Sequence, residues 1–186
     1  MTAQMSNIAA SRTLQQSMRA LCEARDDARL ATPCVLIDGN AVSRNIERMA
    51  AYCKSHGIAL RPHTKTHKSQ RIAQMQLDAG ATGLTVAKPG EARVMSALGA
   101  PILIAYPPIT PSSLAAIGEL AEAGDVLVAA DSVEAVRRLE VAAPARGRRV
   151  GVLVDVNVGM NRTGVSDVEE YLVSGVHRDQ IRWIEE

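Results

Sequence analysis

Lysines are scarce in this chain, and two of them lie in one short polar segment. The 186 residues include 17 arginines but only four lysines, at positions 54, 65, 68 and 88. Two of the four belong to the run Arg61-Pro62-His63-Thr64-Lys65-Thr66-His67-Lys68, which follows the apolar residues 58–60. A lysine at the end of a buried strand would lie at the open face of a β/α fold, where loops gather reacting groups. Lys65 is therefore the first candidate for chemistry.

The amine of Lys65 can react only if its surroundings lower its pKa. A free lysine has a pKa of about 10.4, so it is protonated and unreactive at neutral pH. The nearby cations Arg61 and Lys68, together with partial burial, would lower that pKa. A neutral amine attacks a carbonyl carbon and forms a Schiff base, as in pyridoxal phosphate sites. A solvated basic strand end is an equally good interpretation of the spacing alone.

The two histidines of this run are further candidates. His63 precedes Lys65 by two positions, so both side chains would point to the same face of an extended strand. A histidine there could transfer a proton, because its ordinary pKa lies near neutrality. A packed, hydrogen-bonded histidine is the alternative. His67 is a weaker candidate of the same kind, and an extended or turning segment would not bring the two rings onto one metal ion.

Apolar runs alternate with helical patterns from Thr32 onward. Strands are predicted at residues 33–37, 58–60, 82–87, 102–106, 126–130 and 150–156. A helix is predicted over 42–53, and others begin near Ser69, Lys88, Thr110 and Asp131. This order is typical of βα units, and the almost wholly apolar strands predict burial on both faces. A barrel and an open doubly wound sheet share the pattern. No GxGxxG follows a strand, so nothing supports a dinucleotide site.

Two motifs together resemble a known family. Residues 61–68 are similar to the cofactor-lysine segment of the D-threonine aldolase and D-serine dehydratase family, within the alanine-racemase-like pyridoxal phosphate enzymes of fold type III. Residues 154–164, Val-Asp-Val-Asn-Val-Gly-Met-Asn-Arg-Thr-Gly, are similar to the family's Asp-x-Gly-x-x-Arg-x-Gly segment. Residues 85–88 and Glu91-Ala92 also resemble the family's second strand and the helix after it. The resemblance covers about residues 30–164.

The resemblance implies a fold and a set of roles. The fold would be α/β: part of a (β/α) barrel with about five or six of its eight strands. Lys65 would form the Schiff base with pyridoxal 5′-phosphate, with His63 as a catalytic partner and His67 as a further cofactor contact. Arg162 would hydrogen-bond the ring oxygen of the cofactor, and Asp155 is a candidate to seat it. A tight loop with a solvated arginine is the alternative for Arg162.

The implied function is that of a pyridoxal phosphate-dependent lyase acting on D-β-hydroxy amino acids, of the aldolase or the dehydratase type. The family uses a divalent metal whose ligands, like its C-terminal β domain, are not recognisable in this sequence. We therefore expect an incomplete form with weak or no activity. The alternatives are a non-catalytic pyridoxal phosphate-binding protein and a non-functional fragment. The expected organisation is an extension over 1–29, a barrel portion over 30–164 and an atypical tail over 165–186.

The composition of the chain limits the classes of partner that it is expected to bind. With 186 residues the chain fits one domain, and an interior without Phe, built from Ala, Val, Leu and Ile, suits a parallel sheet. A net charge of +1 gives no global attraction to nucleic acid or to an anionic membrane, and no apolar stretch is long enough to span one. Three cysteines without CxxC spacing predict a reducing, cytoplasmic location. A small-molecule D-amino acid and a second copy of the chain, as a homodimer, are the expected partners.

Overall fold

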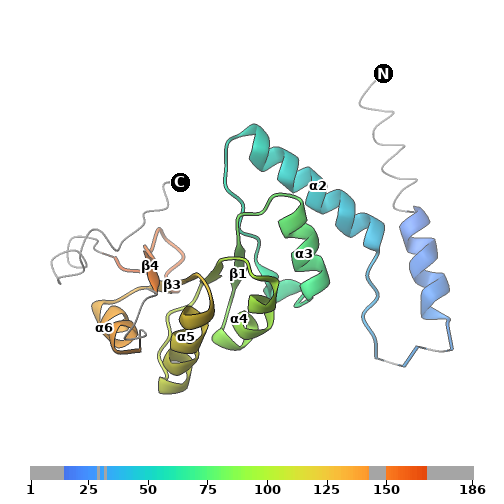
Figure 1. Cartoon of the computed structure of the whole chain (residues 1–186). Coiled ribbons are helices and arrows are strands. Elements are labelled where there is room, and N and C mark those ends of the chain that lie inside the picture. Colours follow the sequence, from blue (N-terminus) through green and yellow to red (C-terminus); the bar gives the residue numbers. More distant parts are fainter. Residues whose placement is uncertain (1–14, 29, 32, 143–149, 167–186) are drawn as a thin grey trace. The chain divides into compact units, whose positions relative to one another are not determined.

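The computed structural model describes residues 15–28, 30, 31, 33–142 and 150–166, and the chain divides into two compact units, residues 1–52 and 53–186 (Figure 1). In the first unit, residues 15–25 are helical and α2 (Gly39–Ser55) begins. Asp38 starts α2, because its Oδ1 accepts the backbone N–H groups of Asn40 at 2.9 Å and Ala41 at 3.1 Å. The helix predicted over 42–53 is confirmed.

The strand predicted at residues 33–37 is wrong. These residues adopt no regular structure, and Val35 remains 87% exposed. An extended apolar run becomes a strand only when a neighbouring strand takes up its backbone hydrogen bonds. None of the strands in the described part of the chain pairs with it.

The second unit contains a parallel sheet of four strands in the order β1-β2-β3-β4. The strands are β1 (Leu84–Val86), β2 (Ile102–Ile104), β3 (Val126–Ala130) and β4 (Gly151–Val154). Leu84 pairs with Ile102, which pairs with Val126, so the first three strands start in register. Four of the predicted strands are confirmed. The resemblance implied five or six barrel strands, and the residues after 166 lie outside the described part of the chain.

The run 58–60 does not form the predicted strand, but the residues after it lie alongside β1. Leu60 accepts the Thr82 N–H through its carbonyl oxygen, and Pro62 accepts that of Thr85, both at 2.9 Å. A single parallel bridge joins His63 to Thr85. Pro62 has no N–H to donate, so the hydrogen-bond ladder stays incomplete. Pairing therefore occurs two to three residues later than the apolar pattern suggested.

Helices follow the strands in alternation: α3 (Gln70–Asp78), α4 (Pro89–Met95), α5 (Pro111–Ala123) and α6 (Val133–Ala142). The 3₁₀ turns η1 (Thr64–Thr66) and η2 (Ser96–Leu98) lie between them. The predicted starts are confirmed within a residue or two. Thr110 caps α5 by accepting the Ser113 N–H at 3.2 Å. For α6 the capping oxygen belongs to Ser132 and not to Asp131, since it is Ser132 that accepts the Ala135 N–H.

The core lies between the sheet and the helices α4, α5 and α6, which cover one face of it (Figure 1). Along β3, buried residues alternate with half-buried ones, and all four residues of β4 are half-buried. The prediction of burial on both faces is therefore only half right for the described residues: the helix-covered face is buried and the other is partly exposed. In this part of the chain, no helix is both long and apolar enough to cross a membrane.

Candidate functional site

The carboxyl ends of parallel strands share one edge of the sheet, and the candidate residues follow those ends. Lys65 follows the segment that pairs with β1, Tyr106 follows β2, Asp131 follows β3, and Arg162 lies in the loop after β4. In β/α folds this edge is where catalytic groups gather. The topology therefore brings loops from distant parts of the sequence to the same side of the sheet.

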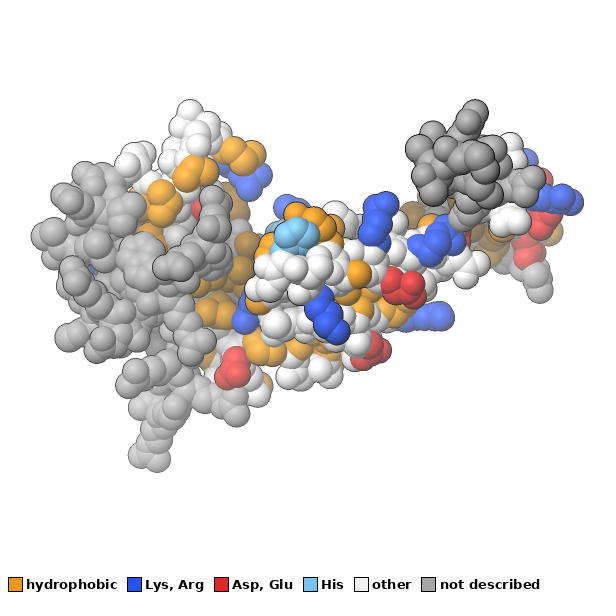
Figure 2. All heavy atoms as spheres, turned by 90° about the horizontal axis from the view of Figure 1, so that it is seen from above, with side chains coloured by type: hydrophobic (Ala, Val, Ile, Leu, Met, Phe, Trp, Pro, Cys, Tyr) orange, Lys and Arg blue, Asp and Glu red, His pale blue; other side chains and the backbone are white. Residues whose placement is uncertain are grey.

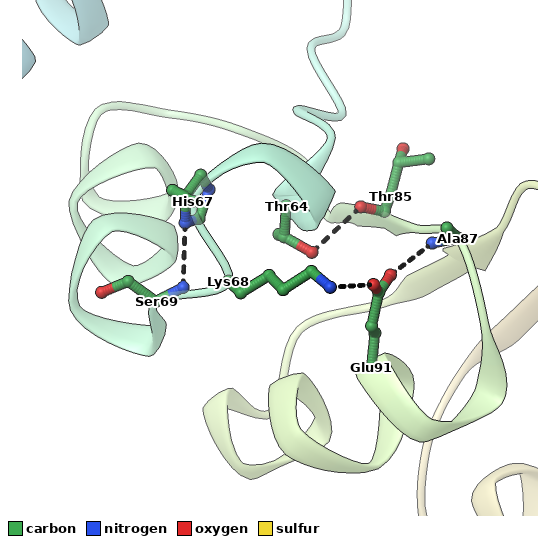
Figure 3. Close-up of polar contacts among 7 residues, drawn as sticks. All are labelled: Thr64, His67, Lys68, Ser69, Thr85, Ala87 and Glu91. Carbon is green, nitrogen blue, oxygen red and sulfur yellow. Dashed lines mark hydrogen bonds and ion pairs between the residues drawn. The ribbon is translucent and has the colours of Figure 1, made fainter. Parts of the chain in front are cut away.

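Lys65 lies in the middle of the η1 turn, and its side chain is exposed. The preceding residue, Thr64, is only 1% exposed, and its hydroxyl donates to the Thr85 carbonyl oxygen at 3.3 Å (Figure 3). Two expectations are thereby corrected. Lys65 is not partly buried, and it does not continue an extended strand from His63, because the backbone turns at Thr64.

Lys68 completes the same segment in an unusual conformation. Its φ is +49°, in the left-handed region that residues other than glycine rarely occupy. Its Nζ lies 3.5 Å from Oε1 of Glu91, and the other carboxylate oxygen accepts the Ala87 N–H at 2.8 Å (Figure 3). Burial would raise the pKa of Glu91, but the Ala87 N–H and the Lys68 ammonium outweigh it and leave that pKa lowered. Glu91 is therefore ionised at neutral pH.

The side chain of His67 is hydrogen-bonded to the local backbone. Its Nδ1 accepts the Ser69 N–H at 3.1 Å, and the Ser69 hydroxyl in turn accepts the Ile72 N–H at the start of α3. Burial lowers the pKa of His67, so its ring is neutral at neutral pH, with the proton on Nε2. This arrangement gives His67 a structural role in the turn, and its contact with a cofactor stays a prediction.

His63 is the better placed of the two histidines for proton transfer. Burial lowers its pKa, and the nearby Lys65 ammonium lowers it further, while the Glu91 carboxylate acts in the opposite direction. Its Nδ1 is buried and has no hydrogen-bond partner among the described residues. A neutral imidazole with an unused nitrogen can accept a proton. His63 and Lys65 lie two positions apart, at the start and in the middle of the same turn.

The loop that carries Arg162 is organised by Asn157. The side-chain Oδ1 of Asn157 accepts the backbone N–H groups of Gly159 and Asn161, both at 3.0 Å. Its Nδ2 donates to Oδ1 of Asn161 at 2.8 Å. One amide side chain thus satisfies three groups of the loop, as asparagine commonly does in turns. Asp155 was considered as the residue that positions Arg162. Its backbone N–H donates to the Ala130 carbonyl oxygen and joins it to the sheet.

Backbone conformation in the same loop explains its glycines. Gly159 has a φ of +124° and Gly164 a φ of +102°, and Asn161 also lies at positive φ. A Cβ on Gly164 would come within 2.5 Å of the Asn157 backbone nitrogen. Glycine is therefore required at 164 for both its conformation and its close approach. The segment is thus a tight loop, as in the alternative that we considered for Arg162.

A cavity of about 310 Å³ opens beside this loop. Its lining comes from the ends of β2 and β3, the start of α6 and the loop after β4; among the lining residues are Tyr106, Ile109, Asp131, Ser132, Arg138 and Arg162. Arg138 is held by Glu134 at 2.9 Å and by the Ile109 carbonyl oxygen at 3.1 Å, whereas no described residue pairs with Arg162. Tyr106, the last residue of the strand predicted over 102–106, is exposed and lines the cavity.

The structure brings only part of the predicted site together. Lys65 and His63 lie at one turn, and Arg162 lines the cavity, but Lys65 is not among the residues that line it. Arg61 has no acidic partner in the described part of the chain; its guanidinium occupies the space that a Cβ on Gly83 would need.

Two residues with structural roles at the site were missed from the sequence, Glu91 and Asn157. The role of Asn157 could have been predicted from the sequence, because asparagine often organises a turn. Here a glycine follows it by two positions and a second asparagine by four. The partner of Glu91 is Lys68, 23 positions away, and no local sequence pattern predicts this pair.

On the face drawn in Figure 2, Lys and Arg side chains of the described residues are interspersed with acidic and hydrophobic ones. This face carries no continuous basic patch among those residues. The small net charge of the sequence is thus matched by a mixed distribution on this side of the protein.

Comparison with known proteins places the chain in a family. Residues 37–181 match the alanine racemase N-terminal domain. The chain is 37% identical over 141 residues to a D-threonine aldolase of an Arthrobacter species, which covers 75% of this chain and 37% of the relative. It is 31% identical over 147 residues to a 3-hydroxy-D-aspartate aldolase of Paracoccus denitrificans, covering 77% of this chain and 38% of the relative.

A solved structure gives the same result. The crystal structure of D-threonine aldolase from Filomicrobium marinum superposes with a TM-score of 0.74 at 35% identity, covering 82% of this chain and 42% of that one. The expected family resemblance and the parallel α/β fold are confirmed. The chain spans about two fifths of the length of these relatives.

Proposed function

Because the chain belongs to the family of the alanine racemase N-terminal domain, we propose that it forms the lysine-bearing part of a pyridoxal phosphate-dependent lyase for D-β-hydroxy amino acids. Relatives named as D-threonine aldolase, 3-hydroxy-D-aspartate aldolase and D-threo-3-hydroxyaspartate dehydratase support the reaction class. The observation that carries the proposal is the exposed amine of Lys65, presented by a turn in which Thr64 is bonded to the Thr85 carbonyl oxygen and Lys68 is paired with Glu91.

The chemistry of the side chains fits pyridoxal phosphate. The cofactor has an aldehyde, which a primary amine such as Lys65 can bind covalently, and an anionic ring oxygen, which the permanent cation of Arg162 suits. The buried, unpartnered Nδ1 of His63 is available to hold or move a proton. When bound, the cofactor supplies a ring that accepts the electrons released at the substrate Cα.

Each residue then has a task of its own. Lys65 anchors the cofactor and must give up its ammonium proton to do so; the exposed amine can release it to water, with His63 two positions away as a candidate partner in the transfer. Arg162 orients the ring from the opposite loop. Thr64 and Glu91 fix the turn from which Lys65 projects.

A lysine label tests this proposal directly. The chain is mixed with pyridoxal phosphate, reduced with borohydride and mapped by peptide mass. We expect the label on Lys65, and its loss in Lys65→Arg, which keeps the charge but cannot condense with an aldehyde at neutral pH. Lys54→Arg is the matched control and keeps the label. Equal labelling of all four lysines would overturn the proposal.

Cofactor binding without turnover is the second candidate. It is favoured by one observation, that Lys65 does not line the cavity next to Arg162. The expectation that these 186 residues alone have weak or no lyase activity stays a prediction, as does the use of a divalent metal. The chain that pyridoxal phosphate labels is incubated with D-threonine, and glycine and acetaldehyde are assayed. This experiment separates the two candidates. Product formation at the rate of a full-length relative would exclude the second.

Compartment and assembly are further parts of the proposal. Cys22 and Cys34 are exposed free thiols, and Cys53 is a buried one. Exposed thiols persist in reducing compartments, which supports a cytoplasmic location. A homodimer remains our prediction, and light scattering of the purified chain measures it.

A further inference from the structure

The two lysines of the 61–68 segment have opposite surroundings although they are three residues apart. No described residue bonds to Lys65, which is exposed in the η1 turn. Lys68 places its Nζ 3.5 Å from Oε1 of Glu91 (Figure 3). Both amines belong to the same basic stretch, so the sequence alone does not explain why one and not the other would meet an aldehyde.

The Glu91 carboxylate is held in place by contacts other than that with Lys68. Its side chain is only 15% exposed, and the Ala87 N–H holds one carboxylate oxygen at 2.8 Å. It also lies in the first turn of α4, where a negative charge is favoured by the helix dipole. The carboxylate is therefore already ordered before Lys68 reaches it, which reduces the entropy that an exposed ion pair normally loses on forming.

The backbone of Lys68 supports the same conclusion. A φ of +49° is costly for a residue with a Cβ, and such conformations persist only where surrounding contacts fix them. Here the Lys68 N–H donates to the Thr64 carbonyl oxygen at 2.8 Å, and the ammonium reaches Glu91. These two contacts direct the side chain toward α4.

We propose that Glu91 selects the reacting lysine: by holding the ammonium of Lys68 it leaves Lys65 as the amine of this segment that condenses with an aldehyde. The inference deepens the proposed function and rests on it for the identity of the natural aldehyde. Glu91 is a positioning residue in this scheme, since it touches Lys68 and not the reacting atoms.

The chemistry makes the selection possible. Condensation needs the lone pair of a neutral amine; nitrogen attacks the carbonyl carbon, the carbonyl oxygen leaves as water, and a C=N bond forms. The Lys68 nitrogen lies against the Glu91 carboxylate and must leave it before it can attack a carbonyl carbon. Lys65 has no such anion among the described residues bonded to it. A hydride from cyanoborohydride then reduces the C=N bond and makes the modification permanent.

Formaldehyde with cyanoborohydride tests this selection independently of any cofactor site. Methylation rates of Lys65 and Lys68 are measured by peptide mass in the wild type, Glu91→Gln, Glu91→Asp and the control Glu119→Gln, which removes the Arg93–Glu119 pair at another exposed site. We expect Lys65 to react faster in the wild type. Glu91→Gln should raise the Lys68 rate about two- to fivefold, the size typical of one partly exposed ion pair. Glu91→Asp should restore part of the difference, and Glu119→Gln should change neither rate.

A Lys68 rate that is the same in the wild type and in folded Glu91→Gln overturns the inference. Should Glu91→Gln fail to fold, added sodium chloride tests the wild type instead, because salt weakens the pair. The Lys68 rate must then rise relative to that of Lys65, and a ratio independent of salt overturns the inference. Repeating the experiment with pyridoxal phosphate separates the two proposals. Selection by formaldehyde without any labelling by pyridoxal phosphate would refute the proposed function alone.

Discussion

The turn that carries Lys65 and the loop that carries Arg162 lie after strands of the same sheet, yet they are held in different ways. The Lys65 turn is tied to distant residues, with Thr64 bonded to the Thr85 carbonyl and Lys68 paired with Glu91. The Arg162 loop is held from within, by the Asn157 side chain and by a close approach at Gly164. The Lys65 turn therefore depends on the assembled sheet, whereas the conformation of the Arg162 loop follows from its own sequence.

The largest effect is expected from Gly164→Ala. The new Cβ would meet the Asn157 backbone at 2.5 Å in a conformation that alanine avoids. Strain and overpacking together should lower the free energy of unfolding by about 3 kcal/mol. Urea denaturation followed by circular dichroism measures the loss.

Gly159→Ala is the matched control for this change, because it has positive φ but open space around it. We expect a loss of about 1–2 kcal/mol from conformation alone. Equal losses for the two variants would show that the close approach at Gly164 contributes nothing.

Asn157→Ala should come next in size. It removes three side-chain hydrogen bonds of one loop, for a cost of about 2 kcal/mol. Asn157→Asp keeps the acceptor and loses only the Nδ2 donor, so it should cost less. Labelling of Lys65 by pyridoxal phosphate should continue in both variants if the two loops are held independently. Loss of the label together with a loss of stability would show that the two loops depend on each other.

Thr64→Val tests the other loop. Valine has the same shape but cannot donate to the Thr85 carbonyl, so we expect a loss of about 1 kcal/mol and slower labelling of Lys65. Thr66→Val, at an exposed position of the same turn, is the control and should have little effect on either quantity. A labelling rate unchanged by Thr64→Val would mean that the tertiary bond does not position the lysine.

The smallest effect is a dependence on pH. Burial lowers the pKa of His63 and of His67, so the unfolded chain binds protons at a higher pH than the folded chain. The stability linked to these rings is complete above the unfolded pKa of about 6.5 and is lost as the pH falls through the lower folded pKa. The urea midpoint should therefore decrease from pH 7.5 to pH 5.5.

Replacing His63 and His67 by glutamine should reduce this decrease, whereas replacing the exposed His56 should not. An equal decrease in all variants would assign the pH dependence to other groups.

The positions of strands and helices were largely predictable because the signals are local. Thr110 and Ser69 cap helices at the predicted places, and four apolar runs became strands. The failures lie where a partner decides the outcome. The run 33–37 found no strand to pair with, and Pro62 delayed the pairing of the segment before Lys65.

The candidate site divides in the same manner. Residue types and spacing singled out Lys65, His63 and Arg162, because an amine, an imidazole and a guanidinium near strand ends have recognisable chemistry. They did not reveal that Thr64 would turn the backbone, or that Tyr106 would be exposed at the cavity.

The sequence alone shows which groups are available for chemistry, and its turn residues favour a tight loop after β4, since such residues act within a few positions of one another. The pairing of Glu91 with Lys68 and the exposure of Lys65 depend on the tertiary structure. Those contacts join residues more than twenty positions apart, and their distance depends on how the strands and helices pack.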